Sequence, residues 1–248
     1  MNPIAQTFGY ILSPANWSST ASNPIGARLG EHLWYTLIAL VITAVIAIPI
    51  GFAIGHTGRG RQVAVLVSGG ARALPTLGVL TLFALLLGVG LEAPILSFVI
   101  LAIPSVLAGA YSGFEAIDRR TIDAARAVGM TEWQIVTQVE IPLGLPLLIG
   151  GLRAAALQIV ATATLAAYVG SGGLGTFIFL GLGANDFVQT AVGAVLVVAL
   201  AILLEIVFSI LQRLVVPAGV RAGRTSFGLV RAPRSRSAAG SPLQEGNN

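Results

Sequence analysis

Cysteine and lysine are absent from this chain of 248 residues, and charged residues of all kinds make up only 10% of it. Without cysteine, the chain forms no disulfide and has no thiolate for catalysis or S-acylation. All 14 positions counted as lysine or arginine are arginine, so the chain cannot supply the lysine of a Walker A phosphate loop. Any energy source that drives its activity must therefore lie on another polypeptide.

The low charge accompanies a hydrophobic content of 55% and a mean hydropathy of +0.88. A soluble domain is roughly 25% charged, so the composition predicts an all-α integral membrane protein. The isoelectric point near 10.3 would also suit a nucleic-acid-binding protein. However, most of the arginines flank apolar runs, which is the distribution expected from membrane topology. We therefore expect no nucleic-acid partner.

Five apolar runs are long enough to cross a bilayer, which requires about 20 residues of helix. The predicted spans are residues 33–55, 63–87, 93–114, 143–170 and 187–214. They divide the chain into an N-terminal segment, 1–30, a transmembrane domain, 31–214, and a tail, 215–248. The tail is rich in Arg, Ser, Gly and Pro and has no apolar periodicity, which predicts disorder. Its arginines suit contact with anionic lipid, and they suit simple solvation equally well.

Glycine and proline predict three local features of these spans. Gly51 and Gly55 form a small-xxx-small face suited to close helix contact. Pro75 interrupts the second span, so we expect a kink or an unwound stretch there. The run 170–175 contains four glycines but no lysine and no flanking strand, so it is not a phosphate loop. A flexible turn followed by a short re-entrant helix is expected instead.

His32 and His56 flank the first span. We expect both to be interfacial side chains and not metal ligands.

The interval 118–142 is the longest charged stretch before the tail, and its local signals predict two short helices. Asp118 or Thr121 suits the N-cap of the first, and Gly129 suits the left-handed residue that ends it. Ile122, Ala125 and Gly129 then share one face of that helix. The small residues on this face would let the backbone of another protein approach closely.

The second helix of this interval is predicted to begin at Thr131. Thr131 and Gln134 have the spacing of a capping box, in which each side chain bonds to the backbone of the other residue. Pro142 is predicted to end this helix, because proline lacks the backbone donor that a continuing helix needs.

The spacing within residues 115–142 resembles the cytoplasmic coupling loop of ABC-transporter permeases. The usual form in that family is Glu-Ala-Ala, three residues, Gly, nine residues, and then Ile, any residue, Leu-Pro. This chain has Asp, Val and Ile at the Glu, Ile and Leu positions, which are conservative changes. The resemblance implies that a cytoplasmic ATPase contacts the chain through Asp123, Ala124, Ala125, Gly129, Ile141 and Pro142.

The distribution of arginine predicts the orientation in the membrane. If the interval 115–142 is cytoplasmic, Arg28 alone falls on the outer side, and the inner side carries Arg59, Arg61, Arg119, Arg120, Arg126, Arg213, Arg221, Arg224, Arg231, Arg234 and Arg236. Short inner loops are enriched in arginine and lysine. We therefore expect a multi-pass protein of the cell inner or plasma membrane, with its N-terminus outside and its C-terminus in the cytoplasm.

Three ionisable residues fall inside the predicted spans: Arg72, Arg153 and Glu205. A charge within the bilayer is costly unless it is paired or hydrated. We therefore hypothesise that Glu205 pairs with Arg153 or with Arg72. A structural pair that holds the helices together is preferred over a role in substrate binding.

Residues 31–214 resemble the permease subunit of an ABC importer of the type I kind. Three stretches match the osmoprotectant branch, whose members import glycine betaine, carnitine, choline or proline betaine: Gly151-Leu-Arg153, Ala161-Thr-Ala-Thr-Leu-Ala-Ala167 and Gly170-Ser-Gly-Gly-Leu-Gly175. Arg72-Ala-Leu-Pro-Thr-Leu77 also resembles the second span of the family. A methionine-type permease remains an alternative, because it too has five spans and a glycine-rich turn after the fourth.

The resemblance implies several partners. These are a cytoplasmic ATP-binding subunit that carries ATP and Mg, a second permease (the same chain or a close homologue), an extracytoplasmic substrate-binding protein, and membrane lipid. No cofactor is expected in this chain. A quaternary ammonium ligand is usually held by aromatic rings, for which the candidates are Trp34, Tyr35, Tyr111 and Tyr168.

Two other classes remain open. A secondary transporter or channel is disfavoured, because no inverted repeat, no chain of intramembrane carboxylates and no pore ring is visible. A membrane scaffold would use the charged interval only to recruit a partner. Enzymatic activity within the chain is disfavoured most, because the predicted spans contain neither an acid–base pair nor a metal-ligand cluster.

Overall fold

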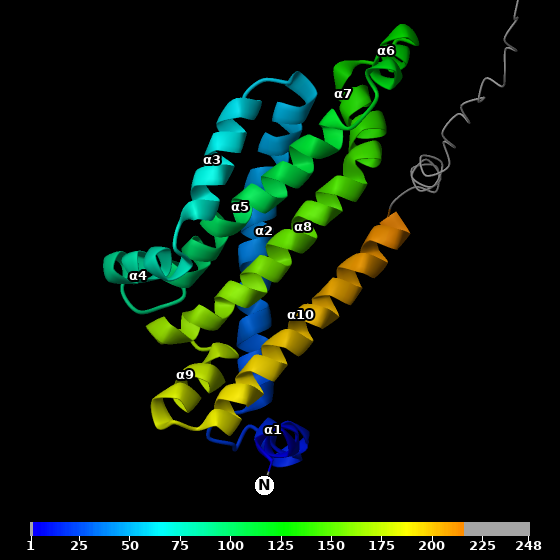
Figure 1. Ribbon diagram of the computed structural model, residues 1–248. Helices are drawn as coiled ribbons and strands as arrows, with labels where there is room; N and C mark the ends of the chain where they lie inside the picture. The colour runs from blue at the N-terminus through cyan, green and yellow to red at the C-terminus, as the bar shows by residue number, and fades with distance from the viewer. Residues whose placement is uncertain (1, 216–248) are drawn as a thin grey trace, which may run out of the picture. The chain divides into compact units, whose positions relative to one another are not determined.

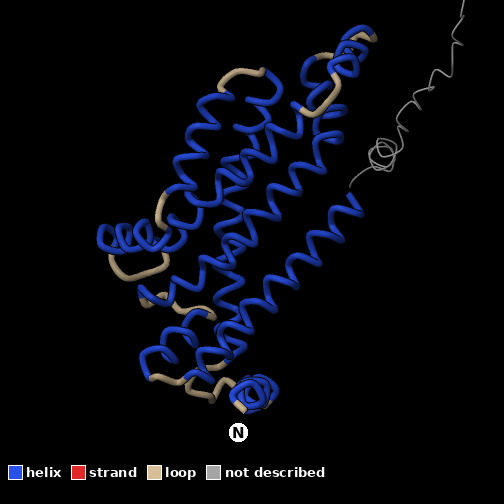
Figure 2. The backbone as a smooth tube through the Cα atoms, in the orientation of Figure 1, coloured by secondary structure: helices blue, strands red, loops and turns tan. Residues whose placement is uncertain are grey.

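The computed structural model describes residues 2–215, and every regular element in that range is helical (Figure 2). In chain order the elements are α1 (Pro3–Leu12), η1 (Pro14–Trp17), α2 (Ile25–Thr57), α3 (Arg61–Ala73), α4 (Thr76–Leu87), α5 (Glu92–Glu115), α6 (Arg119–Ala127), α7 (Glu132–Ile135), η2 (Val136–Glu140), α8 (Ile141–Ala163), η3 (Thr164–Val169), α9 (Gly175–Ala184) and α10 (Phe187–Val215). The predicted disorder of the tail, and its arginines, lie outside the described residues.

Within residues 2–215, four helices are long and apolar enough to cross a membrane: α2, α5, α10 and the continuous helical segment Glu132–Val169 that contains α8. The helices α3 and α4 meet at a bend of 86° and count as a fifth span only when taken together. The bend lies at Leu74 and Pro75, which both have extended backbone angles. The predicted interruption is therefore confirmed, because proline disfavours helix at its own position and at the residue before it.

Glycines allow α2 to pack closely against α5. A Cβ atom on Gly51 would lie 2.4 Å from the Cβ of Ala110, and one on Gly55 would lie 2.9 Å from the carbonyl oxygen of Tyr111. Only a residue without a side chain fits at these distances, so the predicted small-xxx-small contact is confirmed.

A second face of α5 packs just as closely on α8. A Cβ atom on Gly109 would lie 2.7 Å from the carbonyl oxygen of Leu147, and one on Gly113 would lie 2.8 Å from that of Gly144. The contact is reciprocal, because a Cβ atom on Gly151 would lie 2.9 Å from the Cα of Gly109. Close contact with both α2 and α8 makes α5 the central helix of the described fold.

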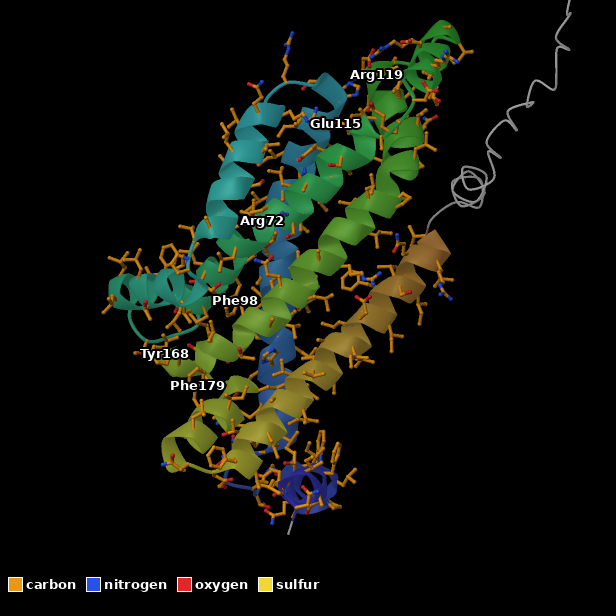
Figure 3. All side chains as sticks on the ribbon, viewed as in Figure 1. Arg72, Phe98, Glu115, Arg119, Tyr168 and Phe179 are labelled. Carbon is orange, nitrogen blue, oxygen red and sulfur yellow. The ribbon has the colours of Figure 1, made fainter. Side chains whose placement is uncertain are left out.

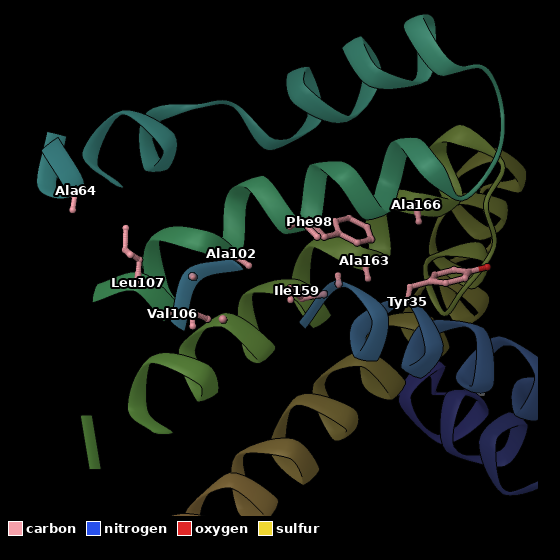
Figure 4. Packing of buried hydrophobic residues seen from close by; sticks show 13 residues of the cluster. Tyr35, Ala64, Phe98, Ala102, Val106, Leu107, Ile159, Ala163 and Ala166 are labelled. Carbon is pink, nitrogen blue, oxygen red and sulfur yellow. The ribbon is translucent and has the colours of Figure 1, made fainter. Parts of the chain in front are cut away.

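A cluster of buried apolar side chains fills the space among these helices. Figure 4 shows Phe98, Ala102 and Val106 of α5 beside Ile159 and Ala163 of α8. Many members of the cluster are alanines, which suits helices in lipid, where close van der Waals packing replaces the hydrophobic effect as the main source of association.

Different elements lie at the two ends of the bundle. We call residues 118–140, which contain α6, α7 and η2, the hairpin. Figure 1 shows the hairpin at the same end as the turn between α2 and α3, and α10 runs toward this end. The opposite end holds α1, α9 and the first residues of α2. We refer to the two as the hairpin end and the N-terminal end.

Candidate coupling site

The first helix of the hairpin begins where the sequence predicts. Asp118 is the N-cap of α6, and its side chain accepts a hydrogen bond of 2.9 Å from the backbone N–H of Arg120. Of the two predicted caps, Asp118 is therefore the one used. Thr121 lies inside the helix.

The end of α6 depends on Gly129, whose φ angle is +88°. The N–H of Gly129 donates to the carbonyl of Arg126, and the N–H of Met130 donates to that of Ala125. This pair of bonds is a Schellman motif, which satisfies carbonyl groups that the helix end would otherwise leave unpaired. The predicted left-handed residue is confirmed.

The second helix begins with the predicted capping box. The N–H of Gln134 donates to the side chain of Thr131, and the side chain of Gln134 accepts from the N–H of Thr131 at 2.8 Å. These reciprocal bonds satisfy two donors at the start of α7.

The prediction that Pro142 ends this helix is wrong. Pro142 lies in the first turn of α8, and the helix runs without interruption from Glu132. The turn before the proline is a π-helix, in which the N–H of Ile141 donates to the carbonyl of Val136. The wider turn shifts the hydrogen-bond register just before the residue that lacks a donor, so the helix continues into α8.

Ile122, Ala125 and Ile135 are buried together inside the hairpin. The prediction that Ile122 and Ala125 face another protein is therefore wrong, because they hold α6 against α7 instead. The exposed surface carries other apolar side chains, notably Val128 and Trp133, which are 78% and 75% exposed.

The predicted contact residues divide between two places. Asp123, Ala124 and Gly129 are exposed on the hairpin, where Asp123 lies 3.7 Å from Arg126. Ala125 is buried inside the hairpin, and Ile141 and Pro142 are partly buried at the start of α8. The motif therefore includes both an exposed surface and the connection from that surface to a membrane helix.

A polar cluster beneath the hairpin was not predicted from the sequence. The Nδ1 atom of His56 lies 2.6 Å from the Oε2 atom of Glu140, which is buried, and Nε2 lies 3.4 Å from Glu132. Glu132 also accepts a hydrogen bond of 2.8 Å from Arg126. That bond stabilises the charged guanidinium and raises the pKa of Arg126.

Of the three ionisable residues predicted inside the spans, Arg153 and Glu205 pair with each other, and Arg72 does not contact them. Arg153 of α8 and Glu205 of α10 form an ion pair that includes a hydrogen bond from Nε to Oε2. Arg72, at the end of α3, is exposed and has no ion-pair partner among residues 2–215 (Figure 3). Of the two hypothesised partners of Glu205, the structure brings only Arg153 to it.

A charge exchange tests this pair. We expect Glu205→Arg to lower the yield of folded protein in detergent, because an unpaired charge at the centre of a span costs about 2.5–3.5 kcal/mol. The double variant Arg153→Glu, Glu205→Arg restores opposite charges and should recover the yield. Arg72→Glu with Glu205→Arg is the control and should not recover it. Equal recovery in both double variants would contradict a specific pair.

The glycine-rich run 170–175 is held by side chains of α2. The N–H of Gly173 donates to Glu31 at 2.8 Å, and the hydroxyl of Tyr35 donates to the carbonyl of Ser171 at 2.5 Å. His32 is fully buried and bonds to the carbonyl of Val160 at 3.0 Å. The predicted interfacial role of His32 is therefore wrong, and α2 holds the run in place. The short helix expected after it is α9.

Comparison with known proteins identifies the family. Residues 22–219 match the family described as "Binding-protein-dependent transport system inner membrane component". The chain belongs to this family. It is therefore the permease subunit of an ABC importer, a multi-pass membrane protein, and permeases of this family have no ATPase site of their own.

Several relatives in this permease family carry the names of osmoprotectants. The chain is 33% identical to the glycine betaine/carnitine/choline transport system permease protein OpuCB of Bacillus subtilis (strain 168), over 78% of this chain and 89% of that protein. It is 31% identical to the choline transport system permease protein OpuBB of the same organism, over 77% and 88%. Identity to the osmoprotectant import permease protein OsmW of Salmonella typhimurium is 29%, over 77% and 91%.

A solved structure shows the same permease architecture. A chain of the methionine ABC transporter MetNI, in an inward-facing conformation, superposes with a TM-score of 0.66 and 27% sequence identity. The match covers 76% of this chain and 94% of the MetNI chain. The all-helical membrane fold predicted from the sequence, of the type I importer permease kind, is therefore confirmed.

Proposed function

We propose that this permease imports compatible solutes such as glycine betaine, choline, carnitine or proline betaine, driven by ATP hydrolysis on a partner. The observation that supports this most is the naming of its relatives. Three permeases named for choline, carnitine or osmoprotectants match it across 88–91% of their own length. The match therefore includes the whole membrane domain, not one shared motif.

We propose that the hairpin end faces the cytoplasm. Among the described residues, this end carries the arginines of the loops and helix ends, namely Arg59, Arg61, Arg119, Arg120, Arg126 and Arg213, and the N-terminal end carries Arg28. This asymmetry follows the positive-inside rule. The N-terminus is then outside.

In this orientation a cytoplasmic ATP-binding subunit, which holds ATP and Mg, docks on the exposed surface of the hairpin. Val128 and Trp133 supply apolar contacts, Ala124 allows close approach, and Asp123 is available to a basic partner residue. The continuous helix through Pro142 then carries movement of the hairpin into α8. A second permease and an extracytoplasmic substrate-binding protein complete the assembly.

Recognition of the solute is assigned to the substrate-binding protein. The candidate aromatic residues do not form a cage within the described residues. Tyr35 is buried and bonded to Ser171, and the ring of Tyr168 contacts Phe179 at a centroid distance of 5.7 Å (Figure 3). Trp34 is 56% exposed on the outer surface of α2.

Reconstitution tests the proposal. The permease is purified with its ATP-binding subunit, inserted into liposomes with ATP inside, and supplied with its binding protein outside. We expect ATP-dependent uptake of radiolabelled glycine betaine, choline or carnitine, and no uptake of methionine.

Each alternative class gives a different result. Uptake of methionine alone would identify a methionine-type permease. Uptake driven by an ion gradient without the ATP-binding subunit would identify a secondary transporter. Binding of the subunit without any uptake would identify a scaffold.

A further inference from the structure

The side chain of His56, at the end of α2, contacts both the π turn η2 and the helix α7. His56 lies in the last turn of α2, with Glu140 of the π turn on one side of its ring and Glu132 of α7 on the other. Glu132 continues the contact to Arg126 of α6. One imidazole therefore connects α2 to both helices of the hairpin.

The chain itself attaches the hairpin to α5 and α8 but not to α2. The helix α6 follows α5 after residues 116–118, and α7 runs through the π turn into α8. The π turn is the less regular part of that helix, and turns of this kind often occur at functional sites. A contact from α2 would therefore limit how freely the hairpin can tilt about this turn.

Glu140 makes this contact specific. Its side chain is only 6% exposed, and His56 is its hydrogen-bonding side-chain partner at 2.6 Å. A carboxylate buried this deeply is costly unless it is paired, so the two side chains favour a single arrangement of α2 and the π turn. The more exposed contact with Glu132 extends that arrangement to the hairpin.

We propose that His56 is a positioning residue for energy coupling. It holds the hairpin at a fixed angle to α2, so that movement imposed on the hairpin reaches α2 as well as α5 and α8. The close packing at Gly51 and Gly55 already joins α2 to α5, and the His56 contact adds a direct path from the hairpin to α2. This inference rests on the proposed function, in which a cytoplasmic ATPase moves the hairpin.

The test uses the complete transporter in liposomes and measures solute imported per ATP hydrolysed. We expect His56→Ala to lower this ratio about tenfold, within the usual range of coupling between sites, while the ATP-binding subunit still co-purifies. Thr57→Ala is the matched control, because the hydroxyl of Thr57 donates to the carbonyl of Ala53 and accepts from the backbone N–H of Arg59, and neither residue belongs to the hairpin. The control should keep the wild-type ratio.

A conservative variant separates positioning from general instability. The variant His56→Gln retains a side-chain N–H that can donate to Glu140 and should keep at least part of the ratio. A His56→Gln variant that folds, binds the ATPase and is as uncoupled as His56→Ala would overturn the proposal.

A distance measurement tests the same idea without the ATPase. Because the chain has no cysteine, spin labels can be placed at Val128→Cys on the hairpin and Ile50→Cys on α2, both of which are exposed in the native protein. In nanodiscs, we expect His56→Ala to broaden the distance distribution between these labels, and Thr57→Ala to leave it narrow. An unchanged distribution in His56→Ala would overturn the proposal, even if the ATPase proved not to bind and the proposed function failed.

Discussion

Gly151→Ala is expected to destabilise this permease by about 1–3 kcal/mol, the usual cost of overpacking a tight interface. The added Cβ atom would lie 2.7 Å from the carbonyl oxygen of Ser105 and 2.9 Å from the Cα of Gly109. Both are backbone atoms of α5, so no side chain can turn aside to make room. The α5–α8 contact would have to separate, and the close contacts at Gly113 and Gly144 would loosen with it.

The neighbouring glycine is the control. A Cβ atom on Gly150 would meet nothing within 4 Å, and its backbone is ordinary helix. Gly150→Ala should therefore gain up to about 1 kcal/mol from helix propensity alone. Thermal unfolding of both variants in detergent, with uptake measured in liposomes, gives the comparison. Equal stability of the two variants would contradict the backbone contact between α5 and α8.

The sequence predicted well what depends on neighbouring residues. The cap at Asp118, the capping box at Thr131 and the left-handed Gly129 each involve residues at most five positions apart. Helix termini have strong local requirements, so residue type is enough to identify them. The same is true of the interruption at Pro75.

Contacts between distant residues were missed. His56 and Glu140 are 84 positions apart, and His32 meets Leu174 across 142 positions. A single histidine at the end of a span gives no sign of its partner, because an interfacial histidine looks the same in the sequence. A buried glutamate at a position where the family motif accepts any residue gives no sign either.

Two predictions made from local sequence were wrong because neighbouring structure gave the residues a different role. Pro142 was expected to end a helix, but a π turn before it removes the conflict with the missing donor. Ile122 and Ala125 were expected to face a partner, but the hairpin is small and needs them for its own interior. In both cases the residue types are compatible with the predicted role, but contacts with the rest of the hairpin and helix give these residues a different one.

Gly129→Val is expected to weaken binding of the ATP-binding subunit and so to lower import. The φ angle of +88° is strongly disfavoured for a β-branched residue, at a cost of about 1–3 kcal/mol. No atom lies within 4 Å of a Cβ placed there, so the cost comes from the backbone and not from crowding. To relieve it, α6 would lose the Schellman bonds at Ala125 and Arg126 and change its angle to α7, which moves the proposed docking surface.

Gly129→Asn isolates this cause, because asparagine adds a side chain of similar size but tolerates the left-handed conformation. We expect Gly129→Asn to retain most of the transport, whereas Gly129→Val should retain the membrane fold and lose binding of the ATP-binding subunit by at least about tenfold, which corresponds to 1.4 kcal/mol. Co-purification with the ATP-binding subunit and uptake per ATP hydrolysed measure the two effects separately. If valine and asparagine impaired docking equally, added bulk on the contact surface would be responsible and not the shape of the helix end. If neither variant changed docking or uptake, the ATPase would have to engage the permease elsewhere than on the hairpin.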